Sequence, residues 1–233
     1  MELYYQPKLH AGYRTVVGAE ALMRWHTPDR KVLVPGQFMA VAEHNEVIRP
    51  VTWWAIKSAV SRLARWPEEL SIAVNITPSL LLGDEIISVV RDALDIHMVK
   101  PKRLTLEVLE SIMVENQEAM LSQLERLRKI GVKISIDDFG TGFSSLSYFR
   151  DLPADEIKID KSFVIPMLSS KKDHAIVKSV IDLAHNFSLQ VVAEGVEDME
   201  IAARLTDLNC DVLQGYVFDR PLPAADFEKR HLP

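Results

Sequence analysis

Two adjacent aspartates, Asp137 and Asp138, follow an alternating β-branched run that begins at Val132. Neighbouring carboxylates repel each other unless one is protonated or a cation lies between them. Because the pair comes at the end of an apolar run that is typical of a buried strand, it indicates a metal site. The alternative is a solvated turn in which Asp138 caps a helix that begins near Ser144, since Asp is also a common turn residue. The two aspartates alone leave both interpretations open.

Polar side chains also interrupt or end other apolar runs that we expect to be strands. They are Glu20, Asn75, Glu107, Lys158, Glu194 and Gln214. In a barrel of parallel strands the carboxyl ends of the strands meet on one face, and this face carries the active site. We therefore expect these side chains to converge with the two aspartates at one mouth.

Several of these residues have an alternative role that requires no chemistry. Glu20 could form a structural ion pair, although its apolar neighbours make an uncompensated buried carboxylate costly. Asn75 could bond to loop backbone, and Gln214 before Gly215 could form a plain turn. Their shared position at strand ends favours the functional interpretation.

The set is rich in oxygen ligands. Its carboxylates and amide suit Mg²⁺ or Mn²⁺, and there are enough of them for two ions bridged by an aspartate. Two such ions activate water and stabilise an in-line displacement at phosphorus, which indicates metal-assisted phosphoester hydrolysis. Lys158, between two isoleucines, could orient the water or stabilise developing negative charge. The rival is an enolase-like reaction in which a metal holds an enediolate and Lys158 acts as the base.

The elements that must position these residues alternate between strands and helices. The expected strands span residues 3–7, 15–25, 70–76, 104–108, 132–136, 156–159, 190–193 and 211–213. The expected helices span residues 35–47, 50–66, 84–96, 116–130, 144–150, 173–186 and 197–208. This order predicts a (β/α)8 barrel formed by one domain over residues 1–233. An open, doubly wound sheet is disfavoured because no Gly-rich phosphate loop follows the first strand.

The first two strands are separated only by residues 8–14, which are too few for a crossover helix. We therefore expect a hairpin near the N-terminus, and with it one antiparallel strand in the barrel. The first strand is expected to stop at Pro7, since proline lacks the N–H that a strand interior uses.

Composition excludes several classes of protein. The formal net charge of −6 argues against a partner such as a DNA or RNA duplex, which is held by broad neutralisation of phosphates. The one cysteine, Cys210, excludes an intrachain disulfide and a Cys-rich zinc site, and we expect it to be a buried thiol. No apolar run approaches the ~20 residues that span a bilayer, so we expect no membrane contact and a cytoplasmic location. The segment could still belong to a longer, membrane-anchored protein.

An ordered series of motifs resembles the EAL-domain phosphodiesterases, which hydrolyse the bacterial second messenger cyclic di-GMP. The matching strings are YQP at residues 5–7, EALMRW at 20–25, EVLE at 107–110, DDFGTG at 137–142, IKID at 157–160, AEGVE at 193–197, QGY at 214–216 and RPLP at 220–223. The tripeptide EAL is a weak signal by itself, whereas the ordered set is specific and extends over almost the whole chain.

This resemblance implies a two-metal enzyme that opens cyclic di-GMP to linear pGpG. It implies one Mg²⁺ or Mn²⁺ held by Glu20, Asn75, Glu107 and Asp137, and a second held by Asp137, Asp138 and Glu194. Catalytic roles follow for Glu20, Asp138, Lys158 and Glu194, substrate contacts for Gln6, Arg24 and Gln214, and anchoring of the loop 139–145 for Glu110. It further implies a homodimer. Ca²⁺ is expected to inhibit, because its larger and looser coordination shell matches a magnesium site poorly.

Three places depart from the usual pattern of this family. Leu109 stands where threonine is usual, Phe143 where tyrosine is usual, and Asn45-Glu46 where a glycine-containing turn is more common. The loss of two hydroxyl groups near the loop could lower activity, which keeps a second interpretation open. In that alternative, the chain is a cyclic di-GMP receptor or regulatory module that acts through protein partners.

Overall fold

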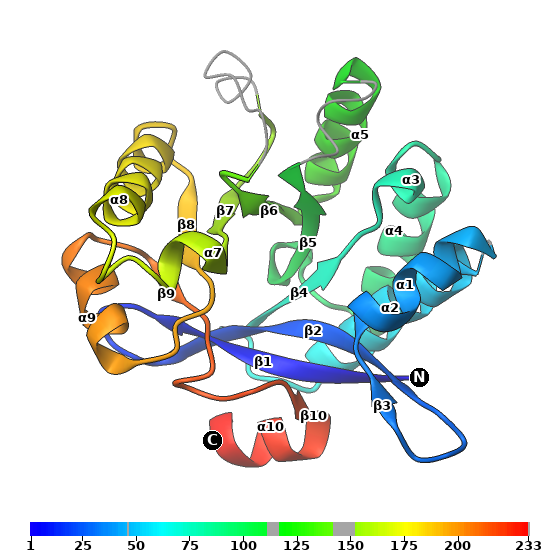
Figure 1. The fold of residues 1–233 in the computed structure, drawn as a ribbon. Helices are drawn as coiled ribbons and strands as arrows, with labels where there is room; N and C mark the ends of the chain where they lie inside the picture. The colour runs from blue at the N-terminus through cyan, green and yellow to red at the C-terminus, as the bar shows by residue number, and fades with distance from the viewer. Residues whose placement is uncertain (46, 111–116, 142–151, 233) are drawn as a thin grey trace.

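The computed structural model describes residues 1–45, 47–110, 117–141 and 152–232. Strands form a closed ring in the centre, and helices surround it (Figure 1). The ring begins with the antiparallel pair β1 (Glu2–His10) and β2 (Val16–His26), in which Gln6 lies opposite Glu20. This pairing confirms the hairpin that the short intervening segment predicts.

Parallel strands complete the barrel. They are β4 (Ser71–Asn75), β5 (Leu104–Leu109), β6 (Lys133–Phe139), β7 (Glu156–Ile159), β8 (Gln190–Ala193) and β9 (Val212–Leu213). β2 pairs in parallel with β4, and β1 closes the ring by pairing antiparallel with both β2 and β9. The predicted (β/α)8-type barrel with one antiparallel strand is therefore confirmed.

β1 is longer than expected, and the prediction that it stops at Pro7 is wrong. On the side of β1 away from β2, β10 (Leu222–Pro223) pairs with Tyr4 and Tyr5, whereas β9 pairs with Leu9 and His10. Pro7 falls between these two stretches, where no partner strand requires its missing N–H on that side. The strand therefore continues past the proline and carries Lys8 into the barrel.

The described helices surround the strands. They are α1 (Pro35–His44), α2 (Ile48–Leu63), α3 (Pro78–Leu81), α4 (Glu85–His97), α5 (Gln117–Ile130), α7 (Lys161–Val164), α8 (Lys171–Asn186), α9 (Met199–Asp207) and α10 (Ala224–His231), with a short 3-10 turn η1 (Pro101–Arg103). Six of them correspond in order to expected helices, with some different boundaries, whereas those of residues 78–81, 161–164 and 224–231 were not expected. The helix expected over residues 144–150 lies outside the described residues. The two-residue strands β3 (Val32–Leu33) and β10 are too short to give a sequence period.

Two helix starts show why boundaries differ from the sequence pattern. α8 begins two residues before the expected position because the Ser170 hydroxyl accepts a hydrogen bond from the backbone N–H of Asp173. α9 begins two residues later than expected because the Asp198 carboxylate accepts one from Ile201. In both cases a capping side chain, and not the apolar period, sets the first turn.

Aliphatic residues fill the layer between the strands and the helices, and aromatic residues pack against the outer face of β1. Tyr5 lies against Trp66 and Phe227 with ring centroids 5.3 and 6.0 Å apart. Since side chains alternate along a strand, the outward direction of Tyr5 places Gln6 and Lys8 inside the barrel. The barrel interior is therefore polar along part of β1. Within the described residues, no helix is long and apolar enough to cross a membrane.

Candidate active site

Lys158 on β7 lies at the centre of the expected mouth and is fully buried. Its Nζ is 2.6 Å from Glu194 Oε1, 2.9 Å from Glu107 Oε2, 3.1 Å from Asp137 Oδ1 and 3.6 Å from Glu20 Oε2. An ammonium between two isoleucines is thus compensated by carboxylates from β2, β5 and β6 and from the residue after β8. The four carboxylates outnumber this one cation.

Glu20 is held by neutral donors as well as by the lysine. Asn75 Nδ2 donates to Glu20 Oε1 over 2.6 Å, and Gln214 Nε2 donates to Glu20 Oε2 over 2.6 Å. Burial alone would raise the pKa of Glu20, but Lys158 and these two amides lower it to about 2. Glu20 is therefore a fixed, ionised carboxylate inside the mouth.

Two other carboxylates carry the opposite shift. Burial, together with the charges of Asp137 and Glu20, raises the pKa of Glu194 to about 7 despite the nearby Lys158. Burial and the charge of Glu20 also raise the pKa of Glu107 well above its usual value. The negative charge at the mouth thus exceeds what the lysine compensates, and a bound divalent cation would stabilise it.

Asp137, Asp138 and Glu194 form a cluster of carboxylates at the mouth. Each offers a carboxylate oxygen, and these oxygens lie within 4.8 Å of one another. Asp138 has a left-handed backbone with φ of 54°, which Asp tolerates better than most residues. Burial and the adjacent Asp137 raise the pKa of Asp138. The donor set fits a hard divalent ion, because such ions take carboxylate oxygens and offset their mutual repulsion.

Close backbone contacts hold the last two strand ends in place. A side-chain carbon added to Gly215 would lie 2.0 Å from the carbonyl oxygen of Val196, so only glycine permits this approach. Gly195 has φ of 67°, and an added carbon there would lie 2.4 Å from Lys161 Cβ. These glycines let the segments that carry Glu194 and Gln214 meet at the mouth.

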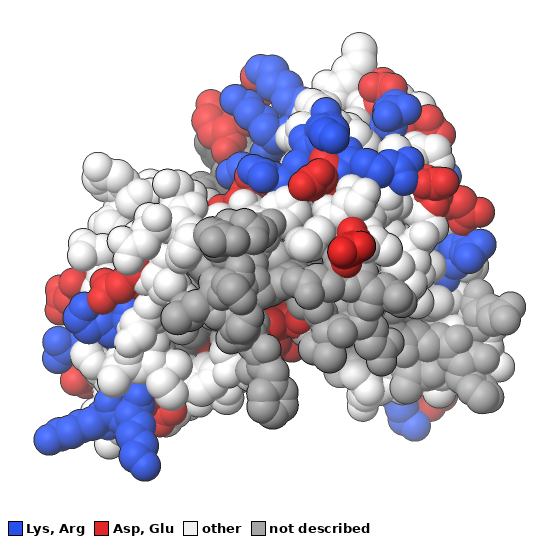
Figure 2. Space-filling model, turned by 90° about the horizontal axis from the view of Figure 1, so that it is seen from above, with Lys and Arg blue, Asp and Glu red and all other residues white. Residues whose placement is uncertain are grey.

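A cavity of about 280 Å³ opens beside the carboxylates. It is lined by Gln6, Glu20, Leu22, Asp137, Lys161, Glu194, Gly195, Glu197, Gln214, Gly215 and Tyr216. Seen from above, acidic atoms are visible at the centre of this face (Figure 2). The sequence interpretation did not identify Lys161 or Tyr216, since neither ends a strand.

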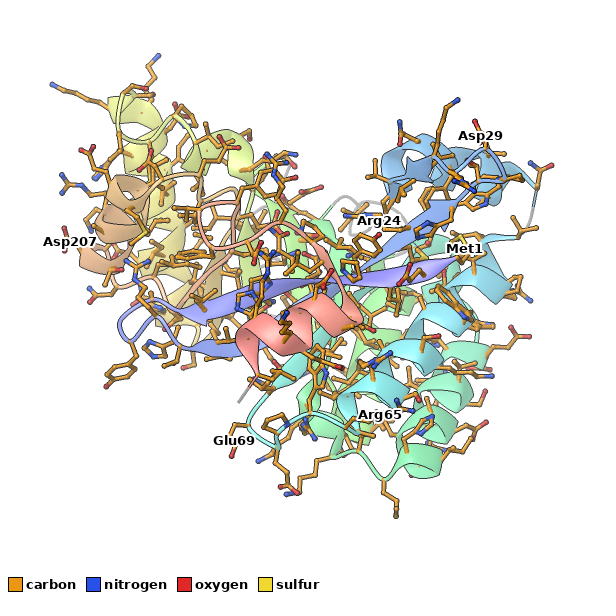
Figure 3. All side chains as sticks on the ribbon, turned by 90° about the horizontal axis from the view of Figure 1, so that it is seen from below. Met1, Arg24, Asp29, Arg65, Glu69 and Asp207 are labelled. Atoms are coloured by element: carbon orange, nitrogen blue, oxygen red, sulfur yellow. The ribbon has the colours of Figure 1, made fainter. Side chains whose placement is uncertain are left out.

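The two expected substrate contacts differ in position. Gln6 lines the cavity and accepts a hydrogen bond of 3.2 Å from Gln214 Nε2. Arg24 lies farther along β2, labelled in Figure 3, and does not line the cavity. Its guanidinium donates to the carbonyl oxygen of Met23 and lies 5.4 Å from the Tyr4 ring centroid. Gln6 therefore lies beside the carboxylates of the mouth, whereas Arg24 lies outside the cavity.

Glu110 follows β5 and is buried. Its Oε2 accepts a hydrogen bond of 2.9 Å from the backbone N–H of Gly140, directly after β6. Leu109, where we noted the absence of a hydroxyl, is partly exposed at the end of β5. Phe143 and the rest of the expected loop beyond Thr141 lie outside the described residues.

A second buried ionic group lies deeper in the barrel, and the sequence interpretation missed it. Lys8 Nζ is 2.9 Å from Glu156 Oε1 and 3.4 Å from Glu107 Oε1. The Ser135 hydroxyl donates to the same Glu156 oxygen over 2.9 Å. A sequence signal did exist, because Lys8 is two residues from Gln6 and so faces the same side of a strand that extends past Pro7.

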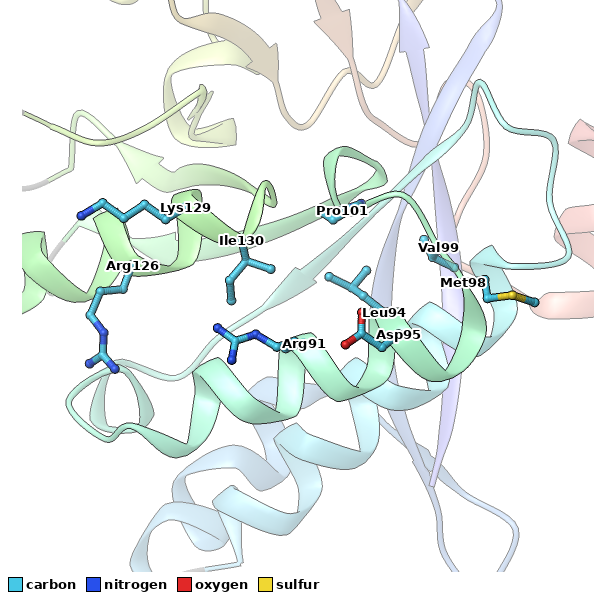
Figure 4. A pocket seen from close by; sticks show the side chains of 9 residues that line it. All are labelled: Arg91, Leu94, Asp95, Met98, Val99, Pro101, Arg126, Lys129 and Ile130. Carbon is cyan, nitrogen blue, oxygen red and sulfur yellow. The ribbon is translucent and has the colours of Figure 1, made fainter.

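A larger groove lies outside the barrel. It has a volume of about 550 Å³ and lies between α4 and α5 (Figure 4). Its polar lining is mainly basic and exposed, with Arg91, Arg126 and Lys129, and Asp95 is its one acidic residue. We place the candidate site at the smaller cavity, since that is where buried charged groups converge.

Cys210 does not line the cavity of the candidate site. It is buried before β9, and burial raises the pKa of its thiol to about 12. Its sulfur lies within hydrogen-bonding distance of the backbone carbonyl oxygens of Val191 and Val212. Its burial agrees with the expected buried thiol, and its raised pKa disfavours the reactive thiolate.

The chain is similar to known proteins over nearly its whole length. The profile of the EAL domain matches residues 1–221. The bifunctional diguanylate cyclase/cyclic di-GMP phosphodiesterase MucR of Pseudomonas aeruginosa is 40% identical over 226 residues, which are 95% of this chain and 33% of that protein. The cyclic di-GMP phosphodiesterase NbdA of the same organism is 40% identical over 233 residues, which are 98% of this chain and 30% of that protein. The chain thus spans about a third of the length of these relatives.

A solved structure, described as the PaMucR phosphodiesterase in complex with c-di-GMP, superimposes with a TM-score of 0.93. It is 39% identical, and the match covers 97% of this chain and 93% of that one. A second, the EAL domain protein from Listeria monocytogenes, has a TM-score of 0.90 and 31% identity, covering 99% and 92% of the two chains. The barrel and the order of its site-bearing strands are therefore shared.

Proposed function

The chain belongs to the EAL domain family, and on this premise we propose that it hydrolyses cyclic di-GMP to linear pGpG in a metal-dependent reaction. One observation carries the proposal. Buried carboxylates from several strands surround Lys158 beside a cavity, an arrangement that is costly for folding and useful for phosphoester chemistry.

The proposed cofactors are two Mg²⁺ or Mn²⁺ ions. Glu20, Asn75, Glu107 and Asp137 would hold one, and Asp137, Asp138 and Glu194 the other. When bound, such ions activate water and stabilise the charge of an in-line displacement at phosphorus. The surplus of carboxylates over ammonium groups supports this assignment.

The protein's own groups would orient the reacting atoms. Asn75 and Gln214 fix the Glu20 carboxylate through hydrogen bonds, so that its oxygens do not reorient during reaction. The Lys158 ammonium would orient the attacking water and stabilise negative charge that develops on the phosphate. The water oxygen then bonds to phosphorus and gives up a proton, while one ester P–O bond breaks and the leaving oxygen takes up a proton.

Substrate binding is proposed for Gln6, Gln214 and Arg24. Gln6 and Gln214 line the cavity and are already joined to each other. Arg24 uses Nη1 for the Met23 carbonyl oxygen, and its remaining N–H groups could bind a phosphate oxygen. Glu110 would anchor the loop after β6 through its contact with Gly140.

The proposal also covers the number of domains, the oligomeric state and the location of the reaction. We propose that residues 1–233 act as one domain, that two copies form a homodimer, and that the reaction takes place in the cytoplasm. Light scattering during size-exclusion chromatography tests the dimer, with a mass near twice 26.4 kDa as the expected result. A mass near 26.4 kDa at working concentration would contradict it.

The test of the main proposal is chromatographic. Purified protein incubated with cyclic di-GMP and Mn²⁺ should yield pGpG, and chelation of the metal should stop the reaction. Binding of the dinucleotide without any pGpG would favour the receptor module instead. Calorimetry in Ca²⁺ separates both from a domain that only binds proteins, since the enzyme and the receptor should bind cyclic di-GMP there.

A further inference from the structure

The polar interior of the barrel has a second tier beneath the mouth. Its members come from distant parts of the chain, with Lys8 on β1, Ser135 on β6 and Glu156 on β7. Lys8 is 5% exposed, Glu156 6% and Ser135 0%. Charged groups buried to this extent occur where they are paired, and Lys8 is paired with two carboxylates.

Glu107 connects this tier to the mouth. One of its oxygens, Oε2, lies 2.9 Å from Lys158 Nζ, and the other, Oε1, lies 3.4 Å from Lys8 Nζ. The carboxylate is therefore held at both oxygens by two different lysines, one in each tier. A carboxylate held at both ends cannot rotate freely about its terminal torsion.

Lys8 is itself fixed from below. Glu156 Oε1 lies 2.9 Å from Lys8 Nζ and accepts a second hydrogen bond from the Ser135 hydroxyl. The chain of contacts runs from Ser135 through Glu156 and Lys8 to Glu107, and it crosses the barrel interior from β6 and β7 to β1 and then to β5. Such outer partners of a metal-binding carboxylate set its orientation.

We propose that Lys8 and Glu156 are positioning residues that orient Glu107 for the divalent ion. This inference rests on the proposed function, because it concerns a residue assigned there to metal binding. The alternative is that the buried pair only stabilises the barrel. The two roles differ in what happens when the pair is removed as a unit.

Three variants separate these roles. Lys8→Met removes the hold on Glu107 and leaves Glu156 buried without its partner, so both stability and metal binding should fall. Lys8→Met combined with Glu156→Gln removes that unpaired charge with side chains of similar size, so the melting temperature should recover. Lys133→Met is the matched control, since Lys133 and Lys8 line one cavity at the end of the barrel opposite the mouth, and no hydrogen bond or ion pair among the described residues joins Lys133 to Glu107.

The measurements are Mn²⁺ titration by calorimetry, thermal unfolding and pGpG formation. We expect Mn²⁺ affinity to fall about 10- to 100-fold in both Lys8 variants and to stay at the wild-type value in the Lys133 variant. If the single variant does not fold, the double variant carries the test alone. Mn²⁺ affinity that is unchanged or tighter in the double variant would overturn the positioning role.

The wild-type protein distinguishes this failure from failure of the proposed function. If it binds Mn²⁺ and forms pGpG while the double variant does the same with equal affinity, the positioning role is wrong and the enzyme assignment stands. If the wild-type protein neither binds Mn²⁺ nor forms pGpG, the proposed function itself is wrong.

Discussion

The barrel mouth and the groove between α4 and α5 differ in the cost of their charges. At the mouth, the carboxylates of Glu20 and Glu107 and the ammonium of Lys158 are almost inaccessible to water. In the groove, the basic side chains lie on the surface, although the groove is about twice as large. Buried charges cost free energy of folding, whereas exposed ones cost little.

This difference teaches that buried charge, more than the size of a depression, identifies the candidate site. A fold keeps several buried carboxylates near one lysine only at a cost in stability, and chemistry at that position gives a reason for them. The groove needs no such reason, because its basic side chains are exposed, and Lys129 in the last turn of α5 also complements the helix dipole.

The largest effect should come from loss of a mouth carboxylate. Glu20→Ala removes one proposed ligand together with the acceptor of two amide hydrogen bonds. We expect pGpG formation to fall about 10³-fold or more, and Mn²⁺ affinity to fall with it. Glu200→Ala is the matched control, because Glu200 is an exposed glutamate on α9. Equal losses in both variants would contradict the special role of the mouth.

Lys158→Ala should separate catalysis from metal binding. Lys158 pairs with four of the carboxylates, so its removal takes a competing cation away from the metal site, which offsets the loss of its contact with Glu107. The attacking water, however, loses its orienting group. We expect kcat to fall about 10²- to 10³-fold with Mn²⁺ affinity undiminished, as measured by steady-state kinetics and calorimetric titration. A parallel loss of Mn²⁺ binding would show that the lysine and Glu20 do not have the separate roles assigned to them.

Replacement of the metal tests the geometry of the mouth. Ca²⁺ prefers six to eight ligands at about 2.3–2.6 Å, whereas Mg²⁺ requires a compact octahedral shell at about 2.0–2.1 Å. We expect Ca²⁺ to support dinucleotide binding in calorimetry but to lower pGpG formation about 10-fold or more relative to Mn²⁺. Full turnover in Ca²⁺ would refute a site fitted to the smaller ion.

The smallest effect is expected in the groove. Arg91→Ala combined with Lys129→Ala alters two exposed side chains for which the described residues provide no ion pair. Activity should stay within about twofold of wild type, and the free energy of unfolding should change by less than about 0.5 kcal/mol. A large loss of pGpG formation in this variant would break the contrast between the two regions.

The fold was predictable because its signals are local. Apolar strands alternate with helical periods, and a short connection between the first two strands forces the hairpin. The convergence of Glu20, Glu107, Asp137, Lys158 and Glu194 also followed from their places at strand ends. Their roles as ligands stay predictions, since they depend on ions that the residues alone do not reveal.

The second tier, formed by Lys8, Ser135 and Glu156, was not predictable in the same way. The rule that proline ends a strand excluded Lys8 from the barrel, and only the gap between β9 and β10 opposite Pro7 explains its place inside. Glu156 was assigned to a strand without a role, because its partner is 148 positions away in sequence. Helix starts at Lys171 and Met199 depended on capping side chains that the apolar period does not register.

The central claim is that the carboxylates of the mouth hold the ions that hydrolyse cyclic di-GMP. The most direct measurement is pGpG yield from chelator-treated protein as a function of added Mn²⁺, alongside a calorimetric Mn²⁺ titration of the same protein. We predict that no pGpG forms before addition and that the yield rises with occupancy of the calorimetric sites. Bound dinucleotide that stays intact at full Mn²⁺ occupancy would contradict the claim.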